Sequence, residues 1–442
     1  MDGVVARVVA ASGDRDRVLD AVKAVALLMV VAGHSLAWHV TPAGTAVNVL
    51  EVTPGLIVIT WLFQVLPLFF AAGAVSNAAS LDRRGAQEFW RHRTRALVTP
   101  VLVYAGCWTL VGLVLAPLSD QVQPAGRFLS QLLWFAGVYL LVVAAVPLTA
   151  RWRTRPIRTL GLWLALIVAV DMTRIWDGPS WLGWLNLLLV WGWLHQLGYS
   201  LPSLRQRARG LVALAAGGLL LLALGLALVG PYSSSLVTVG GDEELSNLAP
   251  PSVVLALYGA AQVLALAAVW PSAQRWLADD RRWTAVALVG ARGMGIYLWH
   301  IPLVGVAAAV ALAVGWVVEP LSAWWWLVHV SVVLVVIPLA WLVAGVAQVG
   351  QTRLDHFRRA LPVPALVASL GAGAVILNIS VTGFATWAGA GMLGLPSAAL
   401  LNLGLLALMW QGTGAAQTDA ESRQLRASGG RGSGGGDGLG GT

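Results

Sequence analysis

Two basic side chains in the first long apolar segment have a spacing that suggests chemistry. Lys23 and His34 are eleven residues apart. An α-helix turns by about 100° per residue and rises about 1.5 Å, so this spacing places both side chains on one helix face, about 16.5 Å apart along the axis. This geometry suits a long ligand with an anionic end at Lys23 and a reactive end near His34.

Acyl-coenzyme A has such a shape, because an extended arm joins its phosphates to a thioester. A histidine can accept a proton from a hydroxyl at neutral pH, which makes His34 a candidate general base or, alternatively, a transient acyl carrier. A simpler interpretation stays open. Lys23 would then only extend to the membrane interface, and His34 would be a hydrogen-bonded helix residue.

A basic run before Pro100 provides a second candidate site. On a helix Arg91 and Arg95 share a face, whereas Arg93 points roughly the other way. Guanidinium groups bind phosphate well, so Arg91 and Arg95 are candidates for holding the coenzyme A phosphates, with Arg292 as a further candidate. The alternative is that these arginines only anchor the ends of membrane spans.

The ninth apolar segment carries Tyr297 and His300, followed by Pro302. A proline removes a backbone donor, which is tolerated inside a membrane where a helix lines a cavity. We therefore expect Tyr297 and His300 to line the same cavity as His34 and to orient the substrates. The alternative for His300 is a structural hydrogen bond between helices.

Composition determines which elements must position these residues. Hydrophobic residues make up 58% of the 442 residues, charged residues make up 11%, and the mean hydropathy is +0.76. A soluble chain carries about 25% charged residues, so soluble enzymes, disordered chains, coiled coils and nucleic-acid binders are excluded. The single cysteine, Cys107, allows no disulfide within the chain and no thiolate metal site.

The apolar runs predict an all-α fold, a polytopic transmembrane helical bundle of about twelve spans. The runs are 18–40, 56–75, 96–117, 128–149, 157–171, 180–199, 210–230, 252–270, 288–317, 324–346, 363–383 and 386–410. An eleven-span count is the alternative, because the last two runs are close together.

The distribution of charge favours twelve spans. Of the 28 Lys and Arg residues, only Arg127 and Arg174 fall outside one set of alternate connections and the adjoining helix ends. The positively charged side of a membrane protein faces the cytoplasm. We therefore expect a protein of the cell membrane with both termini in the cytoplasm, and this arrangement requires an even number of spans. The expected regions are a cytoplasmic N-terminus (1–17), a ten-span domain (18–346), two additional spans (347–410) and a disordered Gly-rich cytoplasmic tail (411–442).

Residues 15–345 resemble the acyltransferase 3 family of integral-membrane acyltransferases. The resemblance rests on Lys23 and His34 preceded by Asp20, Pro67-Leu-Phe-Phe, the basic run before Pro100, Leu133-Trp-Phe, Gly198-Tyr199 and Ile296-Tyr-Leu-Trp-His-Ile-Pro302. The chain departs from the family pattern at three places. Lys23 replaces the usual Arg, which removes a bidentate fork. The family's Arg-x-x-Arg is not literally present, because His92 and Arg95 have its spacing whereas Arg91 and Arg95 have its charges, and which pair takes its place stays open. Ala72 replaces a Ser.

The resemblance implies transfer of an acyl group, commonly acetyl, from cytoplasmic acyl-CoA to a hydroxyl of a carbohydrate, a glycolipid or another exported molecule. Acyl-CoA is then a co-substrate, and no tightly bound cofactor, metal or nucleic-acid partner is expected. Two other hypotheses stay open at this stage. One is a secondary transporter or flippase, and the other is a family member without catalysis. The sequence leaves the acceptor, the acyl group and the oligomeric state open.

Overall fold

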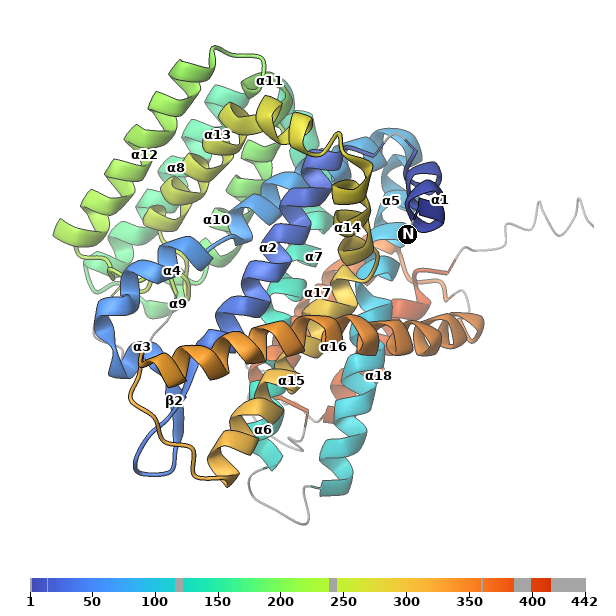
Figure 1. The fold of residues 1–442 in the computed structure, drawn as a ribbon. Coiled ribbons are helices and arrows are strands. Elements are labelled where there is room, and N and C mark those ends of the chain that lie inside the picture. The colour runs from blue at the N-terminus through green and yellow to red at the C-terminus, as the bar shows by residue number, and fades with distance from the viewer. Residues whose placement is uncertain are drawn as a thin grey trace, which may run out of the picture.

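The computed structural model describes residues 2–13, 15–115, 122–237, 245–358, 361–384 and 399–414. Within these residues the chain is a bundle of helices with one two-stranded hairpin (Figure 1). The predicted all-α membrane bundle is therefore confirmed. The predicted Gly-rich tail lies outside the described residues, except for its first few.

The elements in chain order are α1 (Asp2–Ser12), α2 (Arg17–Leu36), β1 (Trp38–Val40), β2 (Ala46–Asn48), α3 (Val49–Val52), η1 (Pro54–Leu56), α4 (Ile57–Phe63), α5 (Leu66–Leu115), α6 (Val122–Ser130), α7 (Leu133–Thr149), η2 (Ala150–Thr154), α8 (Pro156–Ile175), α9 (Ser180–Gly183), α10 (Asn186–Gly198), α11 (Leu201–Leu204), α12 (Arg209–Val229), α13 (Val253–Trp276), α14 (Asp280–Ala291), α15 (Gly293–Ala313), α16 (Ala323–His356), α17 (Ala365–Thr382) and α18 (Ala399–Gln411). The strands β1 and β2 pair antiparallel, with Trp38 opposite Asn48.

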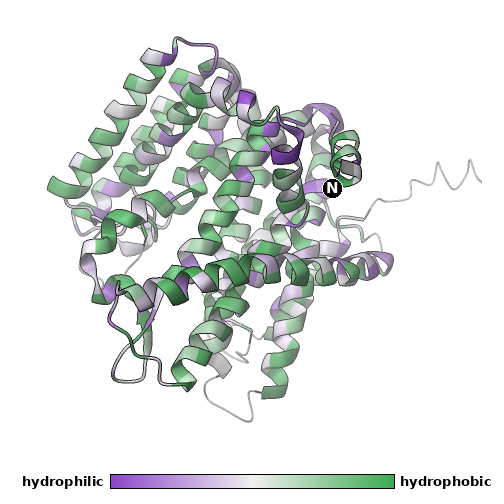
Figure 2. Ribbon diagram, in the orientation of Figure 1, coloured by the Kyte–Doolittle hydropathy of each residue, from purple (hydrophilic) through white to green (hydrophobic). Residues whose placement is uncertain are grey.

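Nine helical segments of the described chain are long and apolar enough to cross a membrane. One of them, Pro54–Leu115, has 62 residues and contains the second and third predicted spans. Helices α10 and α18 coincide with the sixth and twelfth predicted runs, but each has only 13 residues. Part of the twelfth run, 386–398, lies outside the described residues. Figure 2 shows that the long helices are apolar over most of their length.

A kink at Gly85 separates the two spans contained in α5. Gly85 has φ 71° and ψ 167°, a backbone conformation that residues with a Cβ rarely adopt. The chain therefore turns back at this glycine, and the two halves of α5 can both cross the bundle. The basic run with Arg91, Arg93 and Arg95 lies just after the turn.

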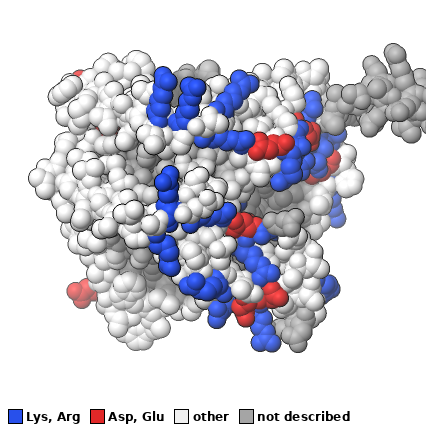
Figure 3. Space-filling model, turned by 90° about the horizontal axis from the view of Figure 1, so that it is seen from above, with Lys and Arg blue, Asp and Glu red and all other residues white. Residues whose placement is uncertain are grey.

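Basic side chains gather at one end of the bundle, which we call the basic face. It includes Arg17 and Arg209, where α2 and α12 begin, and Arg275 in the last turn of α13. Seen from above, this face carries Lys and Arg over its width, with fewer Asp and Glu (Figure 3). Helix α2 begins here because the carboxylate of Asp16 accepts the backbone N–H groups of Val18 and Leu19.

Arg174, one of the two arginines outside the basic side in the charge pattern, has a buried partner. Its Nη1 is 3.0 Å from Oδ1 of Asp171, whose side chain is 1% exposed. The same carboxylate accepts hydrogen bonds from Asn186, from the hydroxyl of Tyr232 and from the backbone N–H of Val253. This fully bonded carboxylate joins α8, α10 and the segment before α13, so Arg174 is a structural residue.

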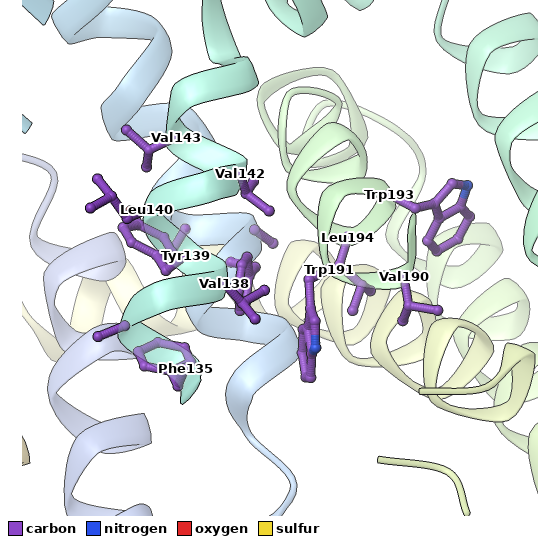
Figure 4. Packing of buried hydrophobic residues seen from close by; sticks show 14 of the residues in the cluster. Phe135, Val138, Tyr139, Leu140, Val142, Val143, Val190, Trp191, Trp193 and Leu194 are labelled. Carbon is purple, nitrogen blue, oxygen red and sulfur yellow. The ribbon is translucent and has the colours of Figure 1, made fainter. Parts of the chain in front are cut away.

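The centre of the bundle is packed mainly by aromatic and branched side chains of α7 and α10. Phe135 and Tyr139 of α7 and Trp191 of α10 lie in this layer (Figure 4). The ring of Phe70 on α5 stacks on Trp191 with centroids 4.8 Å apart. This packing fixes α5, α7 and α10 relative to one another.

Helix α17 also packs in this core, against α7 and α5. The contact depends on two glycines, because a Cβ on Gly137 would lie 2.9 Å from the carbonyl oxygen of Gly373. Small residues at such positions let two membrane helices approach closely. A buried hydrogen bond of 2.5 Å between the hydroxyls of Thr94 and Ser369 joins α17 to α5.

Candidate active site

Two histidines from different helices meet inside the bundle. His34 lies in the last turn of α2, and His300 lies on α15 and has no exposed surface. Nε2 of His300 is 3.2 Å from Nδ1 of His34, and the ring centroids are 5.3 Å apart. The structure thus places together two residues that the sequence singled out in segments 266 positions apart.

The hydrogen bonds determine which nitrogens carry protons. Nδ1 of His300 is 2.8 Å from the carbonyl oxygen of Tyr297, so this nitrogen is the donor and Nε2 of the neutral ring is an acceptor. Nδ1 of His34 must therefore carry the proton that bonds to His300. The remaining nitrogen, Nε2 of His34, keeps a lone pair. No described residue forms a hydrogen bond with it.

Tyr297 lies beside the histidine pair. Its ring centroid is 6.2 Å from that of His300, and its hydroxyl donates to the carbonyl of Leu132. The hydroxyl is therefore engaged with the backbone at the start of α7, and Tyr297 offers mainly its ring to the site. The predicted pair Tyr297 and His300 does lie next to His34.

A row of aromatic rings continues from Tyr297 toward the other end of α2. The centroids of Tyr297 and Phe135 are 5.4 Å apart, and those of Phe135 and Tyr139 are 6.1 Å apart. Phe69 of α5 contacts both Phe135 and Tyr139. We call these four side chains the aromatic row. It joins the histidine pair to a group of polar side chains around Lys23.

Lys23 lies at a partly buried cationic end of this row. Its Nζ donates to the hydroxyl of Ser76 at 2.7 Å, and Asp20 lies 3.9 Å away. Nη2 of Arg93 donates to the carbonyl oxygen of Ser76 at 2.9 Å. One serine of α5 thus receives hydrogen bonds from two cations. We call Lys23 and Arg93 the cationic pair.

Buried polar atoms near this pair have open hydrogen-bonding capacity. Asn77 has no exposed surface, and its Nδ2 lies 3.1 Å from Nε2 of His195 and 3.4 Å from the hydroxyl of Tyr139. Among the described residues, Oδ1 of Asn77 and Nε of Arg93 have no partner. Such atoms are costly to bury alone, so they mark a place where a polar ligand or water would be stabilised.

The sequence pattern did not single out Ser76, Asn77, Tyr139 or His195 for this site. A usable signal existed for Asn77, since an amide at the end of an apolar run is expensive in a membrane. His195 carried the same kind of signal, because it is an ionisable residue in the sixth apolar run, but its place near the end of that run suggested an interfacial residue. Ser76 and Tyr139 carried no comparable signal. These side chains are assembled only by the packing of α5, α7 and α10.

Arg93, which reaches Ser76 beside Lys23, was not among the arginines predicted to bind the coenzyme A phosphates. The predicted arginines Arg91, Arg95 and Arg292 lie in different surroundings. Arg95 forms a bidentate ion pair with Asp355 of α16, with Nη2 and Oδ2 2.9 Å apart. It lines a polar pocket of about 460 Å³ between α5 and α16. Arg292 stacks over the ring of Trp341 at 3.5 Å and donates to the Trp341 carbonyl. Nε of Arg91 is buried and has no described partner.

Comparison with family models places most of the chain in a known family. The model of the acyltransferase domain family Acyl_transf_3 matches residues 16–345. The match covers most of the chain and contains the histidine pair, the aromatic row and the cationic pair. The chain therefore belongs to this family and is a membrane acyltransferase.

The family match ends within α16, so α17 and α18 lie beyond it. No curated protein and no solved structure matches the chain.

Proposed function

We propose that this protein moves an acyl group, in the simplest case acetyl, from cytoplasmic acyl-CoA to a hydroxyl of a carbohydrate, a glycolipid or another exported or surface acceptor. The observation that carries the proposal is the hydrogen-bonded pair of His34 and His300, which leaves Nε2 of His34 free. The proposed location is the cell membrane, with the basic face and both termini in the cytoplasm.

The acyl-CoA phosphates would bind near the basic face. Lys23 and Arg93 supply two positive charges with unfilled hydrogen-bonding capacity beside them. Arg91, Arg95 and Arg292 would extend this positive region as further binding residues. The aromatic row then lies along the path of the extended arm, and the thioester reaches the histidine pair.

The reaction requires one proton transfer in each direction. Nε2 of His34 accepts the proton of the acceptor hydroxyl while its oxygen attacks the thioester carbonyl. The carbon–sulfur bond then breaks, the coenzyme A thiolate leaves, and His34 returns the proton to the sulfur. The products are the ester and free coenzyme A.

His300 has a positioning role in this scheme. Its Nε2 accepts the proton of Nδ1 of His34, which holds the catalytic ring in one tautomer and orientation. When His34 becomes positively charged, this hydrogen bond becomes stronger. His300 itself is held by the Tyr297 carbonyl.

The central test measures acyl-CoA-dependent labelling of the acceptor by membranes that contain wild type or His34→Ala. We expect the variant to lose transfer by a factor on the order of 10² to 10⁴, the usual contribution of a general base. The control is His356→Ala, an exposed histidine on α16 that bonds only to Thr352 within its own helix. Full activity of His34→Ala would contradict the proposed mechanism.

A further inference from the structure

A second buried histidine, outside the candidate site, has two hydrogen-bond acceptors. His329 on α16 has no exposed surface. Its Nδ1 is 2.8 Å from the carbonyl oxygen of Trp325, and its Nε2 is 2.9 Å from the carbonyl oxygen of Trp38. Both ring nitrogens therefore face carbonyl oxygens, one in the same helix and one at the start of β1.

A carbonyl oxygen can only accept a hydrogen bond, so each nitrogen that bonds to one must carry a proton. Neutral imidazole has one such proton, and imidazolium has two. A neutral His329 would direct one nitrogen lone pair at a carbonyl lone pair at a position with no exposed surface, which is unfavourable. Both hydrogen bonds can therefore form only when the His329 ring is positively charged.

The aromatic surroundings of His329 also favour a positive charge. The Trp325 ring stacks on the imidazole with centroids 3.9 Å apart, and the rings of Trp38 and Trp316 lie at 4.4 and 6.1 Å. Indole is the side chain whose ring face attracts cations most strongly. Burial opposes the charge, but two charge-assisted hydrogen bonds and three indoles act against this penalty.

His39 on β1 is the titratable group whose charge acts on His329 among the described residues. Burial lowers the pKa of His39 from its ordinary value, so this ring is mostly neutral at pH 7 and its repulsion of a charged His329 is small. The close surroundings of His329 thus contribute carbonyl oxygens, indole rings and one mostly neutral imidazole.

The carbonyl of Trp38 is close in the chain to the catalytic residue. Helix α2 ends at Leu36, and the backbone N–H of Ala37 donates to the carbonyl of His34. Strand β1 begins one residue later, at Trp38. A group that holds the Trp38 carbonyl therefore also holds the turn of α2 that carries His34.

We propose that His329 is a positioning residue that works as a buried imidazolium, binds the Trp38 carbonyl and thereby holds His34 against His300. Its effect on transfer rests on the proposed function. The charge state of His329 does not rest on the proposed function, so an experiment can contradict the charge state and the proposed function separately.

The first test reads the charge state of His329 directly. Wild-type protein with ¹⁵N-labelled histidine is reconstituted in lipid nanodiscs at pH 7, and its ring nitrogens are observed by NMR. The His329 signals are assigned by their loss in His329→Gln, and the exposed His356 serves as an internal reference. We expect two protonated nitrogens on His329. One protonated and one unprotonated nitrogen would overturn the proposal, whatever the acyl-transfer assay gives.

The second test separates charge from packing by comparing His329→Lys with His329→Phe. Lysine retains a positive charge and donors for both carbonyls, whereas phenylalanine retains only the ring stacking. We expect His329→Phe to lower kcat about tenfold with an unchanged KM for acetyl-CoA, and His329→Lys to recover most of kcat.

Thermal unfolding is measured for each variant in the same detergent, so that kcat is compared only between folded proteins. Equal kcat for the folded Lys and Phe variants would refute the role of the charge. The matched control is His356→Phe on the same helix, which should leave kcat unchanged because its ring bonds only to Thr352.

Discussion

Ser76 brings two cations together at the buried end of the aromatic row. Lys23 comes from α2 and Arg93 from the second half of α5, and each donates to a different oxygen of Ser76. Two positive charges this close repel each other in a site of low dielectric. An anion would remove this repulsion, which is why the pair is the favoured place for the donor phosphates.

This placement predicts the kinetics of two neutral variants. Lys23→Gln and Arg93→Gln should each raise the KM for acetyl-CoA by about tenfold, the loss of one charge-assisted hydrogen bond, while kcat changes little. Steady-state kinetics at varied acetyl-CoA concentration measure both parameters. The control is Arg153→Gln, since Arg153 is an exposed residue paired with Asp82. A selective fall in kcat would argue against phosphate binding at this pair.

Part of the site could be predicted from helical spacing alone. Lys23 and His34 lie on one uninterrupted helix, so their separation follows from the rise per residue. Their partners could not be predicted in this way. Ser76 and His300 reach them from α5 and α15, and their position depends on packing that no local pattern contains.

At the scale of elements, the packing of α17 depends on small residues. Gly373 faces Gly137 of α7, and Cβ atoms would approach the opposing helix within contact distance at both positions. The hydrogen bond between Thr94 and Ser369 fixes the same helix against α5. Together these contacts make α17 a part of the acyltransferase core, although the family match ends before it.

The close approach predicts that Gly137→Ala destabilises the protein by about 1 to 3 kcal/mol, because the added methyl group forces the helices apart. The change should appear as a lower thermal unfolding temperature in detergent. The matched control is Gly217→Ala on α12, where a Cβ would meet nothing within 4 Å. That variant should be unchanged or slightly more stable, since alanine favours the helix. Equal stability of the two variants would disprove the close contact.

The apolar runs predicted that these segments form helices. They did not always predict where a helix ends or which of its faces turns toward a neighbouring helix. The second and third runs lie in two helices that meet directly at Gly85, because a glycine with positive φ lets the chain turn without a separate loop. The sequence predicted correctly that Arg93 and Arg95 point in different directions. Which of them faces Lys23 depends on the phase of the helix after Gly85, and that phase is set by tertiary contacts.

At the scale of the whole molecule, charge is divided between the two ends of the bundle. Figure 3 shows the basic face with Lys and Arg gathered upon it. Arg174, which lies outside this pattern, is neutralised by Asp171. From the positive-inside rule we expect the basic face to lie in the cytoplasm.

This orientation can be checked with single cysteines in a Cys107→Ala background, since Cys107 is the one cysteine of the chain. Ser180 and Ser203 are both exposed, and they lie near opposite ends of α10, in α9 and α11. An impermeant maleimide added to intact cells should label Ser180→Cys at once and Ser203→Cys only after lysis. The reverse order would place the basic face outside.

The position of α17 has a consequence for the synthesis of the chain. Thr94 and Ser369 form one hydrogen bond although they are 275 residues apart. The ribosome delivers the N-terminal residues first, so α5 and α7 enter the membrane well before α17 exists. During this interval the glycine surface of α7 must face lipid or an assisting protein. The core therefore reaches its final packing only after α17 has been translated, and nascent chains halted before α17 should lack it.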